Sequence, residues 1–119
     1  MNYPEHQIQA AFFKWARMEK GIPLLDTIYV IPNAAKRSVR MASIMKAEGM
    51  LSGVWDVHWP VPRGRYAGLW IEFKAGKNGL SENQVLFRNK LQEFFKFVVC
   101  YDWLSAANTV RAYSRQPSK

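Results

Sequence analysis

Apolar residues recur at spacings of three and four near the start of the chain. The positions that share this stripe are Glu5, Ile8, Phe12, Trp15 and Glu19. Such spacing places side chains on one face of a helix, and it predicts a helix over residues 4–20, opened by Pro4 and stopped by Gly21. The stripe that faces the core therefore begins with a carboxylate.

The pattern then changes to β-branched and aromatic runs, which are typical of strands. Residues 27–31 form the first such run, and Pro32 ends it. A basic loop over 33–40 follows, and then a short helix to about Glu48, closed by Gly49. This part of the chain is expected to supply one strand and one short helix.

A hairpin is predicted in the middle of the chain, because strand-like residues 56–60 and 69–74 flank a turn rich in Pro, Gly and Arg. Ser81 and Gln84 then form a capping box. The segments expected beyond the hairpin are a helix from Ser81 to about Lys96, a strand over 97–101 and a helix over 105–115. The order α-β-α-β-β-α-β-α predicts an α/β fold, a mixed central sheet flanked by helices.

The hairpin brings two carboxylates and a lysine together. Side chains alternate faces along a strand, so Glu72 and Lys74 lie on the same face. If the hairpin turns symmetrically about Gly64, Asp56 and Glu72 are equidistant from the turn and lie opposite each other. Opposed Cβ atoms are roughly 4.5–5.5 Å apart, so the two carboxylates would be side by side.

Two carboxylates this close repel each other, and one takes up a proton unless a cation lies beside them. Oxygen ligands of this kind suit Mg²⁺ or Mn²⁺. Lys74 could then stabilise a phosphate oxygen or help to deprotonate an attacking water, which makes the group suitable for phosphodiester hydrolysis. The alternative is a structural charge network in which Lys74 pairs with either acid on a solvated face of the sheet.

The order of these motifs resembles a known nuclease superfamily. Gly53-Val54-Trp55-Asp56, a hairpin and then Glu72-Phe73-Lys74 resemble the PD-(D/E)XK superfamily, in which a lone Asp on one strand precedes Glu-X-Lys on the next. With the helical Glu5 before them and Leu80-Ser81-Glu82-Asn83-Gln84 after them, nearly the whole chain resembles the VRR-NUC family. The resemblance implies a PD-(D/E)XK nuclease-like fold.

The resemblance also implies roles for individual residues. It implies metal binding by Asp56, by Glu72 and by the backbone carbonyl of Phe73, together with a catalytic role for Lys74. Phe73 departs from the smaller aliphatic residue that the family often has there. A ligand that is a backbone carbonyl makes little demand on that side chain.

The resemblance further implies that Glu5 reaches the metal through water and that Gln84 supports the site. Each lies on the face of its helix that is expected to point toward the sheet. Each also has a structural alternative. Glu5 would stabilise the dipole of the first helix, and Gln84 would serve only in the capping box.

Three polar residues near this group have open roles. His58 lies one pleat from Asp56, and it could be either a site residue or an ordinary aromatic neighbour. Asn33 follows a strand end and could line the cleft or belong to a plain loop. His6 lies on another helical face than Glu5 and is expected at the surface.

The charge of the chain favours a polyanionic partner. Seventeen Lys and Arg against nine Asp and Glu give a formal net charge of +8, and phosphates attract such a surface. Basicity alone does not identify nucleic acid, since many small basic proteins bind none specifically. The residues expected to contact DNA phosphates on either side of the metal, with solubility as the alternative role, are Lys36, Arg37, Arg40, Lys46, Arg63 and Arg65.

The length of 119 residues favours a single domain over residues 1–113, with 114–119 as a frayed tail. Cys100 is the only cysteine, so an intramolecular disulfide is excluded and a buried structural thiol is expected. No apolar stretch has the length of a membrane span, and the first residues lack the apolar core of a signal peptide. A cytoplasmic protein is expected.

The leading hypothesis is an endonuclease that cleaves DNA with Mg²⁺ or Mn²⁺. The resemblance is to compact phage or bacterial members of the family, and it implies a homodimer that cuts four-way (Holliday) junctions or other branched DNA. One alternative is a nuclease of the same fold that prefers flaps or a defined duplex. The other is a basic DNA-binding module without catalysis.

Overall fold

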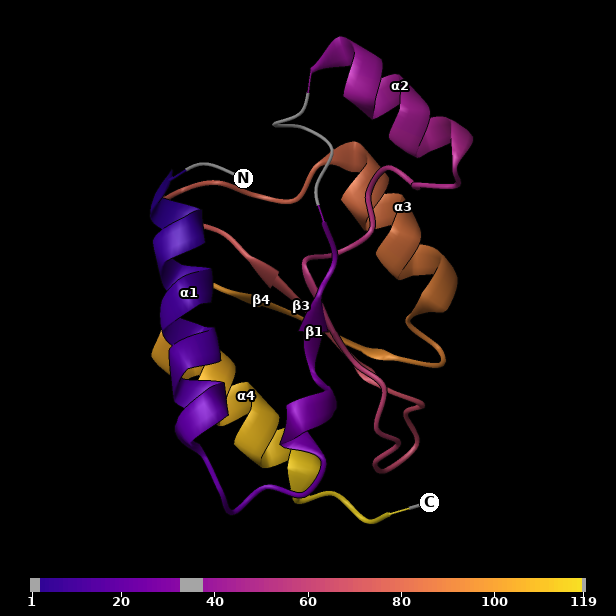
Figure 1. The fold of residues 1–119 in the computed structure, drawn as a ribbon. Coiled ribbons are helices and arrows are strands. Elements are labelled where there is room, and N and C mark those ends of the chain that lie inside the picture. The colour runs from indigo at the N-terminus through magenta and orange to yellow at the C-terminus, as the bar shows by residue number, and fades with distance from the viewer. Residues whose placement is uncertain (1–2, 33–37, 119) are drawn as a thin grey trace.

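A four-stranded sheet lies at the centre of the protein, with helices around it (Figure 1). The computed structural model describes residues 3–32 and 38–118. In chain order the elements are α1 (Tyr3–Met18), η1 (Leu25–Thr27), β1 (Tyr29–Val30), α2 (Val39–Ala47), β2 (Val57–Trp59), β3 (Leu69–Phe73), α3 (Glu82–Leu91), β4 (Lys96–Cys100) and α4 (Trp103–Ser114). The predicted mixed sheet is confirmed.

The strands lie in the order β1-β2-β3-β4. β1 and β3 each pair antiparallel with β2, whereas β3 and β4 are parallel. A parallel pair needs a crossover between its strands, and α3 supplies it. The site described below lies at the end of the sheet where β3 ends and β2 begins.

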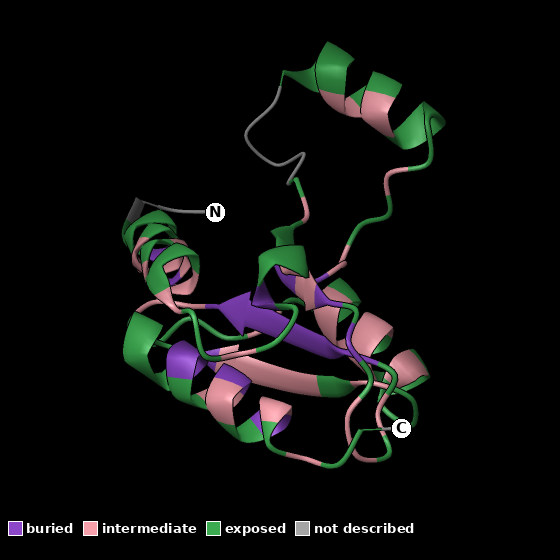
Figure 2. Cartoon of the chain, turned by 60° about the horizontal axis from the view of Figure 1, so that its bottom comes forward, coloured by how far each residue is buried: buried purple, intermediate pink, exposed green. Residues whose placement is uncertain are grey.

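One face of the sheet forms the main core with α1 and α4. Odd-numbered residues of β2 and β3 point to this face, among them Trp59 and Phe73, and they pack in one cluster with Phe12 of α1 and Val110 of α4. Every residue of β3 is buried, because α3 covers the other face (Figure 2). Cys100 is buried here as expected, and burial raises the pKa of its thiol.

The opposite face is an aromatic layer beneath α3. Trp70 stacks on His58 at 4.1 Å between ring centroids and meets Phe87 of α3 edge-on at 5.2 Å. Trp55 packs edge-on against Phe97 at 4.9 Å. This layer holds α3 against the strands that carry the carboxylates.

The hairpin has the predicted register. Val57 pairs with Ile71, and His58 with Trp70, so paired residues are equidistant from Gly64. Gly64 has φ +56°, a conformation that favours glycine in a tight turn. Its N–H donates to the Pro117 carbonyl at 2.7 Å, which attaches the C-terminal segment to the hairpin turn.

Several predicted boundaries differ from those of the structure, most of them by one or two residues, and two of the differences have a clear physical reason. The strand predicted over 27–31 begins only at Tyr29, because the Thr27 N–H bonds to the Leu24 carbonyl and closes a 3-10 helix. The helix predicted to about Lys96 ends at Leu91. Phe94, placed in that helix by its apolar side chain, is 53% exposed, and Lys96 begins β4.

α2 lies above the rest of the chain and has no buried residue (Figure 2). Ser38 caps its first turn by accepting a bond from the Met41 N–H, and Gly49, at φ +104°, follows its end as predicted. Within 3–32 and 38–118, no helix is long and apolar enough to cross a membrane.

Candidate active site

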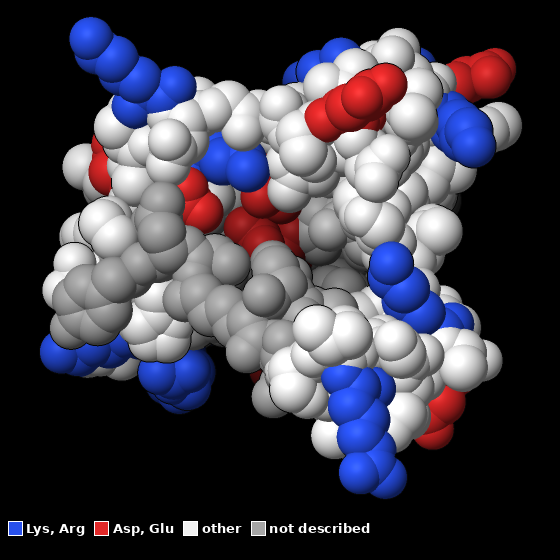
Figure 3. All heavy atoms as spheres, turned by 90° about the horizontal axis from the view of Figure 1, so that it is seen from above, with Lys and Arg blue, Asp and Glu red and all other residues white. Residues whose placement is uncertain are grey.

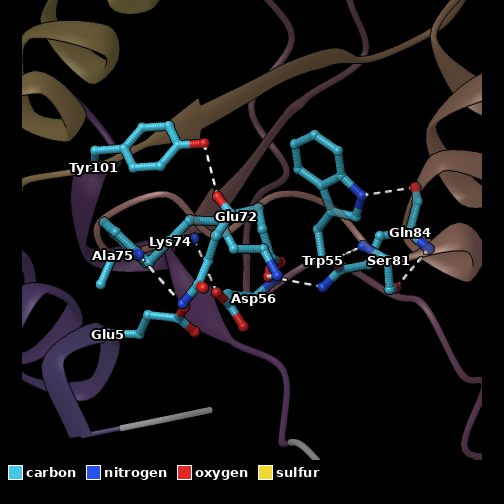
Figure 4. A network of polar contacts seen from close by, with 11 residues as sticks. Glu5, Trp55, Asp56, Glu72, Lys74, Ala75, Ser81, Gln84 and Tyr101 are labelled. Carbon is cyan, nitrogen blue, oxygen red and sulfur yellow. Dashed lines mark hydrogen bonds and ion pairs between the residues drawn. The ribbon is translucent and has the colours of Figure 1, made fainter.

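Asp56 and Glu72 lie beside each other at the base of the hairpin (Figure 4). The Asp56 N–H donates to Glu72 Oε1 at 3.0 Å, and the Phe73 N–H donates to Asp56 Oδ2 at 2.9 Å. Each carboxylate therefore bonds to the backbone of the strand that carries the other. These two bonds extend the hairpin ladder by side chains where the regular β2–β3 pairing has ended.

Both carboxylates are withdrawn from solvent. Asp56 is 8% exposed and Glu72 is 3% exposed. The alternative of a charge network on a solvated face therefore does not describe them. A buried acid pair is costly unless partners compensate its charge, and such pairs are concentrated at functional sites.

Lys74 and Gln84 both approach the same oxygen of Glu72. The Lys74 ammonium lies 3.4 Å from Glu72 Oε2, and its side chain is 12% exposed. The Gln84 amide nitrogen donates to this oxygen at 2.7 Å. One carboxylate oxygen thus has two donors, while the other faces Asp56.

Gln84 holds the capping box and the carboxylate together. Its Oε1 accepts a bond from the Ser81 N–H at 2.9 Å, and its own N–H donates to Ser81 Oγ at 3.2 Å. Its amide nitrogen remains directed at Glu72. The predicted capping box is therefore confirmed, and the bond to Glu72 leaves Gln84 in a position from which it could also support the site.

The segment before Asp56 fixes the start of α3. The Trp55 ring nitrogen donates to the Gln84 carbonyl at 3.0 Å, and Ser52 Oγ accepts from the Asn83 amide at 3.0 Å. Gly53 has φ +91°, and a Cβ there would collide with the Asn83 carbonyl. Gln84 is thereby held in position from the strand side as well as from its own helix.

Glu5 lies on α1 at the edge of the same group and is 7% exposed. Its Oε2 accepts bonds from the Ala75 N–H at 3.3 Å and from the Asn78 amide at 3.0 Å. The Tyr101 hydroxyl donates to the Asn78 carbonyl at 2.9 Å. Glu5 thus connects α1 to the loop that follows Lys74, and its charge contributes to the rise in the pKa of Asp56.

Burial raises the pKa of both central carboxyl groups. For Glu72 it is the largest cause, the neighbouring Asp56 charge adds to it, and the pKa reaches about 7 although Lys74 lowers it. The pKa of Asp56 is also raised, mainly by burial, against the opposing effects of the Phe73 N–H and Lys74. A cation beside the pair would keep both groups ionised at neutral pH.

The donor set fits a hard divalent cation. Carboxylate and carbonyl oxygens are the ligands that Mg²⁺ and Mn²⁺ prefer. In the described part of the chain, no three His, Cys, Asp or Glu side chains form a ligand cluster. Two carboxylates with the adjacent carbonyl of Phe73 are consistent with this, because the third protein ligand would then come from the backbone.

The predicted basic residues divide into separate groups. Lys46 and Asp56 line the same cavity, and Arg40 is exposed on α2. Arg63 and Arg65 lie at the other end of the hairpin, where they donate to the backbone carbonyls of Ser114 and Glu93. Lys36, Arg37 and Asn33 lie outside the described residues.

The face that carries the carboxylates is hollowed. Figure 3 shows Asp and Glu atoms at the bottom of the hollow, while Lys and Arg side chains are scattered over the surrounding surface together with other acidic side chains. A recessed acidic centre on a chain with a net charge of +8 is suited to a polyanion whose one reacting phosphate contacts a metal.

His58 contacts aromatic neighbours rather than the carboxylates. Its Nδ1 bonds to the Tyr29 hydroxyl at 2.8 Å and its ring stacks on Trp70. Burial lowers its pKa, which favours the neutral imidazole. These contacts support the interpretation of His58 as an aromatic neighbour.

A solved structure has the same architecture. A protein described as a VRR_NUC domain protein superposes with a TM-score of 0.81, covering 99% of this chain and 93% of that chain at 24% sequence identity. The chain has the VRR_NUC fold. No family model and no curated protein matches its sequence.

The contacts of two residues near this site were not predicted from the sequence. Asn78 bonds to Glu5, and no spacing or motif around it suggests that it would. Trp55 supports Gln84, and its only signal is its position directly before Asp56. Both contacts cross between distant segments, which a single sequence does not reveal.

Proposed function

We propose that this chain is an endonuclease that hydrolyses DNA phosphodiester bonds with Mg²⁺ or Mn²⁺. The observation that carries the proposal is the buried pair Asp56 and Glu72, with the Lys74 ammonium 3.4 Å from Glu72. Burying two adjacent acids is costly, and a cation bound between them and a phosphate would compensate their charge.

Each residue has a defined part in this proposal. Asp56, Glu72 and the Phe73 carbonyl would hold the cation, and Glu5 would reach it through water. The cation supplies Lewis-acid polarisation of the phosphoryl group and lowers the pKa of water. Lys74 stabilises charge on the phosphate oxygens or orients the attacking water, and Gln84 fixes the orientation of the Glu72 carboxylate.

The proposed substrate is DNA, with branched DNA preferred. The net charge of +8 favours a nucleic acid. Lys46, which lines the same cavity as Asp56, and Arg40, exposed on the same helix, would contact phosphates. The preference for four-way junctions and the homodimer rest on the family resemblance. Two identical centres related by a twofold axis would account for paired cuts in two strands.

The test is cleavage of labelled junction, flap and linear duplex DNA with Mn²⁺. Asp56→Ala and Lys74→Ala should each abolish detectable cutting. Asp26→Ala and Lys20→Ala are matched controls, because both side chains are exposed near the far end of α1. The controls should cut like the wild type.

Cutting that persists in Asp56→Ala of unchanged fold would contradict the assignment of the site. If the wild type binds DNA but cuts none of the substrates, and neither metal alters its melting temperature, the chain is a binding module. Equal cutting of junction and duplex would remove the preference for branched DNA and leave the nuclease.

A further inference from the structure

A cavity of about 560 Å³ opens beside the carboxylates, between α2 and the start of α3. Asp56 and Gln84 form part of its lining. Val39, Ala42, Ser43 and Lys46 of α2 also line it, and their spacing of three and four places them on one face of the helix. A group bound in this cavity would therefore lie next to the phosphate held by the site.

The lining combines three kinds of surface. Apolar side chains, such as Leu51 and Val54, are suited to the flat faces of a base. The hydroxyls of Ser43 and Ser52 can donate to or accept from base edges. Lys46 supplies a positive charge in the same wall. This charge would attract a DNA strand, which carries one negative phosphate at each nucleotide.

The size of the cavity suits one nucleotide. Cavities of about 300–1,000 Å³ are those that hold small molecules. A base inside a duplex is stacked and paired, so it reaches such a cavity only when it is unpaired or turned out of the helix. The cavity therefore selects an unpaired nucleotide rather than a base pair.

We propose that this cavity binds a single unpaired nucleotide of the DNA strand, adjacent to the phosphodiester that is cleaved. The inference rests on the proposed nuclease function and specifies its substrate: DNA in which a base is free next to the cut. Flaps and bulges supply such a base, and a four-way junction supplies it when a base pair at its branch point opens, whereas a continuous duplex does not. Sequence tolerance follows, because the apolar wall contacts base faces, which all four bases have.

The test measures binding by fluorescence anisotropy of a labelled duplex and of the same duplex with one extra, unpaired nucleotide. Ca²⁺ replaces Mg²⁺ as a hard cation with different coordination geometry, and a gel confirms that the DNA stays intact. Ala42→Trp fills the cavity from α2. Met41→Trp is the control, since Met41 is 46% exposed on the same helix and does not line the cavity.

The wild type should bind the DNA with the unpaired nucleotide about tenfold more tightly than the duplex, as burial of one base face would provide. Ala42→Trp should remove this ratio, and Met41→Trp should keep it. The proposal is overturned if the wild type binds the two DNAs equally tightly. The same holds if Ala42→Trp keeps the tenfold ratio of affinities, including the case in which it weakens binding of both DNAs by the same factor. It is also overturned if the mass in solution shows a dimer that Ala42→Trp dissociates, because a second copy would then fill the cavity.

Failure of this proposal is distinguishable from failure of the nuclease proposal. A wild type that cuts both DNAs equally with Mn²⁺ and binds them equally retains the nuclease and loses the nucleotide site. A wild type that keeps the tenfold ratio and cuts neither DNA retains the site and loses the nuclease.

Discussion

Glu72 combines burial, a neighbouring negative charge and two donors on one oxygen. In the folded chain without metal, the pKa of Glu72 is about 7, so this carboxyl group stays protonated up to nearly neutral pH. In the unfolded chain it loses its proton near pH 4.5. Ionising the group in the fold is therefore unfavourable. The same residue that would bind a cation makes the protein less stable when the cation is missing.

The unfolding free energy of the metal-free protein should fall as pH rises. Below pH 4.5 Glu72 is protonated in both states and contributes no penalty. The penalty grows between pH 4.5 and about 7 and is complete above that range, amounting to on the order of 3 kcal/mol. Urea denaturation in EDTA at pH 5 and pH 8 measures it.

Glu72→Gln should flatten this pH dependence, because the amide does not ionise. Glu93→Gln serves as the control, since Glu93 is exposed, and its profile should match that of the wild type. Equal slopes for the wild type and Glu72→Gln would show that the raised pKa of Glu72 has no effect on stability.

Addition of metal should restore the unfolding free energy that the protein loses at high pH. Mn²⁺ at a hundred times its dissociation constant should stabilise the fold by about 2.7 kcal/mol at pH 8. It should stabilise much less at pH 5, where protons compete for the carboxylates. Differential scanning calorimetry with and without EDTA checks this, and Asp56→Asn should show no response to the metal. A wild type that melts at the same temperature with and without Mn²⁺ at pH 8 would argue against a cation site.

At the scale of elements, the turn before β2 determines where α3 begins. Trp55 bonds to the Gln84 carbonyl, and Gly53 lies so close to Asn83 that no side chain fits. The orientation of the Glu72 carboxylate therefore depends on a contact between a turn and a helix terminus.

Gly53→Ala should destabilise the fold and reduce cleavage together. Gly49→Ala is the matched control, because both glycines have positive φ but nothing lies within 4 Å of a Cβ at position 49. Both substitutions bring backbone strain of about 1 kcal/mol, and only Gly53→Ala adds the collision with Asn83. Equal melting temperatures for the two variants would contradict this account.

The hairpin and the capping box could be predicted because their signals are local. The register followed from the position of Gly64, and with it came the contact between Asp56 and Glu72. The predicted helix was too long because Phe94 continues its apolar spacing, but an apolar residue at helical spacing need not be buried. Arg63 lies at the turn beside Gly64, at the opposite end of the hairpin from the carboxylates, and its contact with phosphate stays a prediction.

At the scale of the whole molecule, charge and shape act together. The chain has a net charge of +8, and one group of acids lies at the bottom of a hollow, with Lys and Arg side chains scattered over the surface around it (Figure 3). DNA would be attracted over a broad surface, while only one phosphate would reach the carboxylates.

Binding of duplex DNA should weaken steeply with salt, because bound phosphates release counterions. Lys46→Ala should reduce the slope of log K against log salt by about 1. Lys20→Ala should leave it unchanged, since Lys20 is exposed near the far end of α1. Anisotropy titrations over a salt series give both slopes, and equal slopes for the two variants would remove Lys46 from the DNA-binding surface.

The double use of Gln84 restricts what evolution can place at that position. A capping box accepts Glu as readily as Gln, but Glu would set a third negative charge against Glu72 Oε2, where Gln84 now donates at 2.7 Å. Asn is one methylene shorter and would not reach both partners. In homologues that keep the carboxylate pair we expect glutamine to persist here, and a change to Glu would mark lineages that have given up the reaction while keeping the helix.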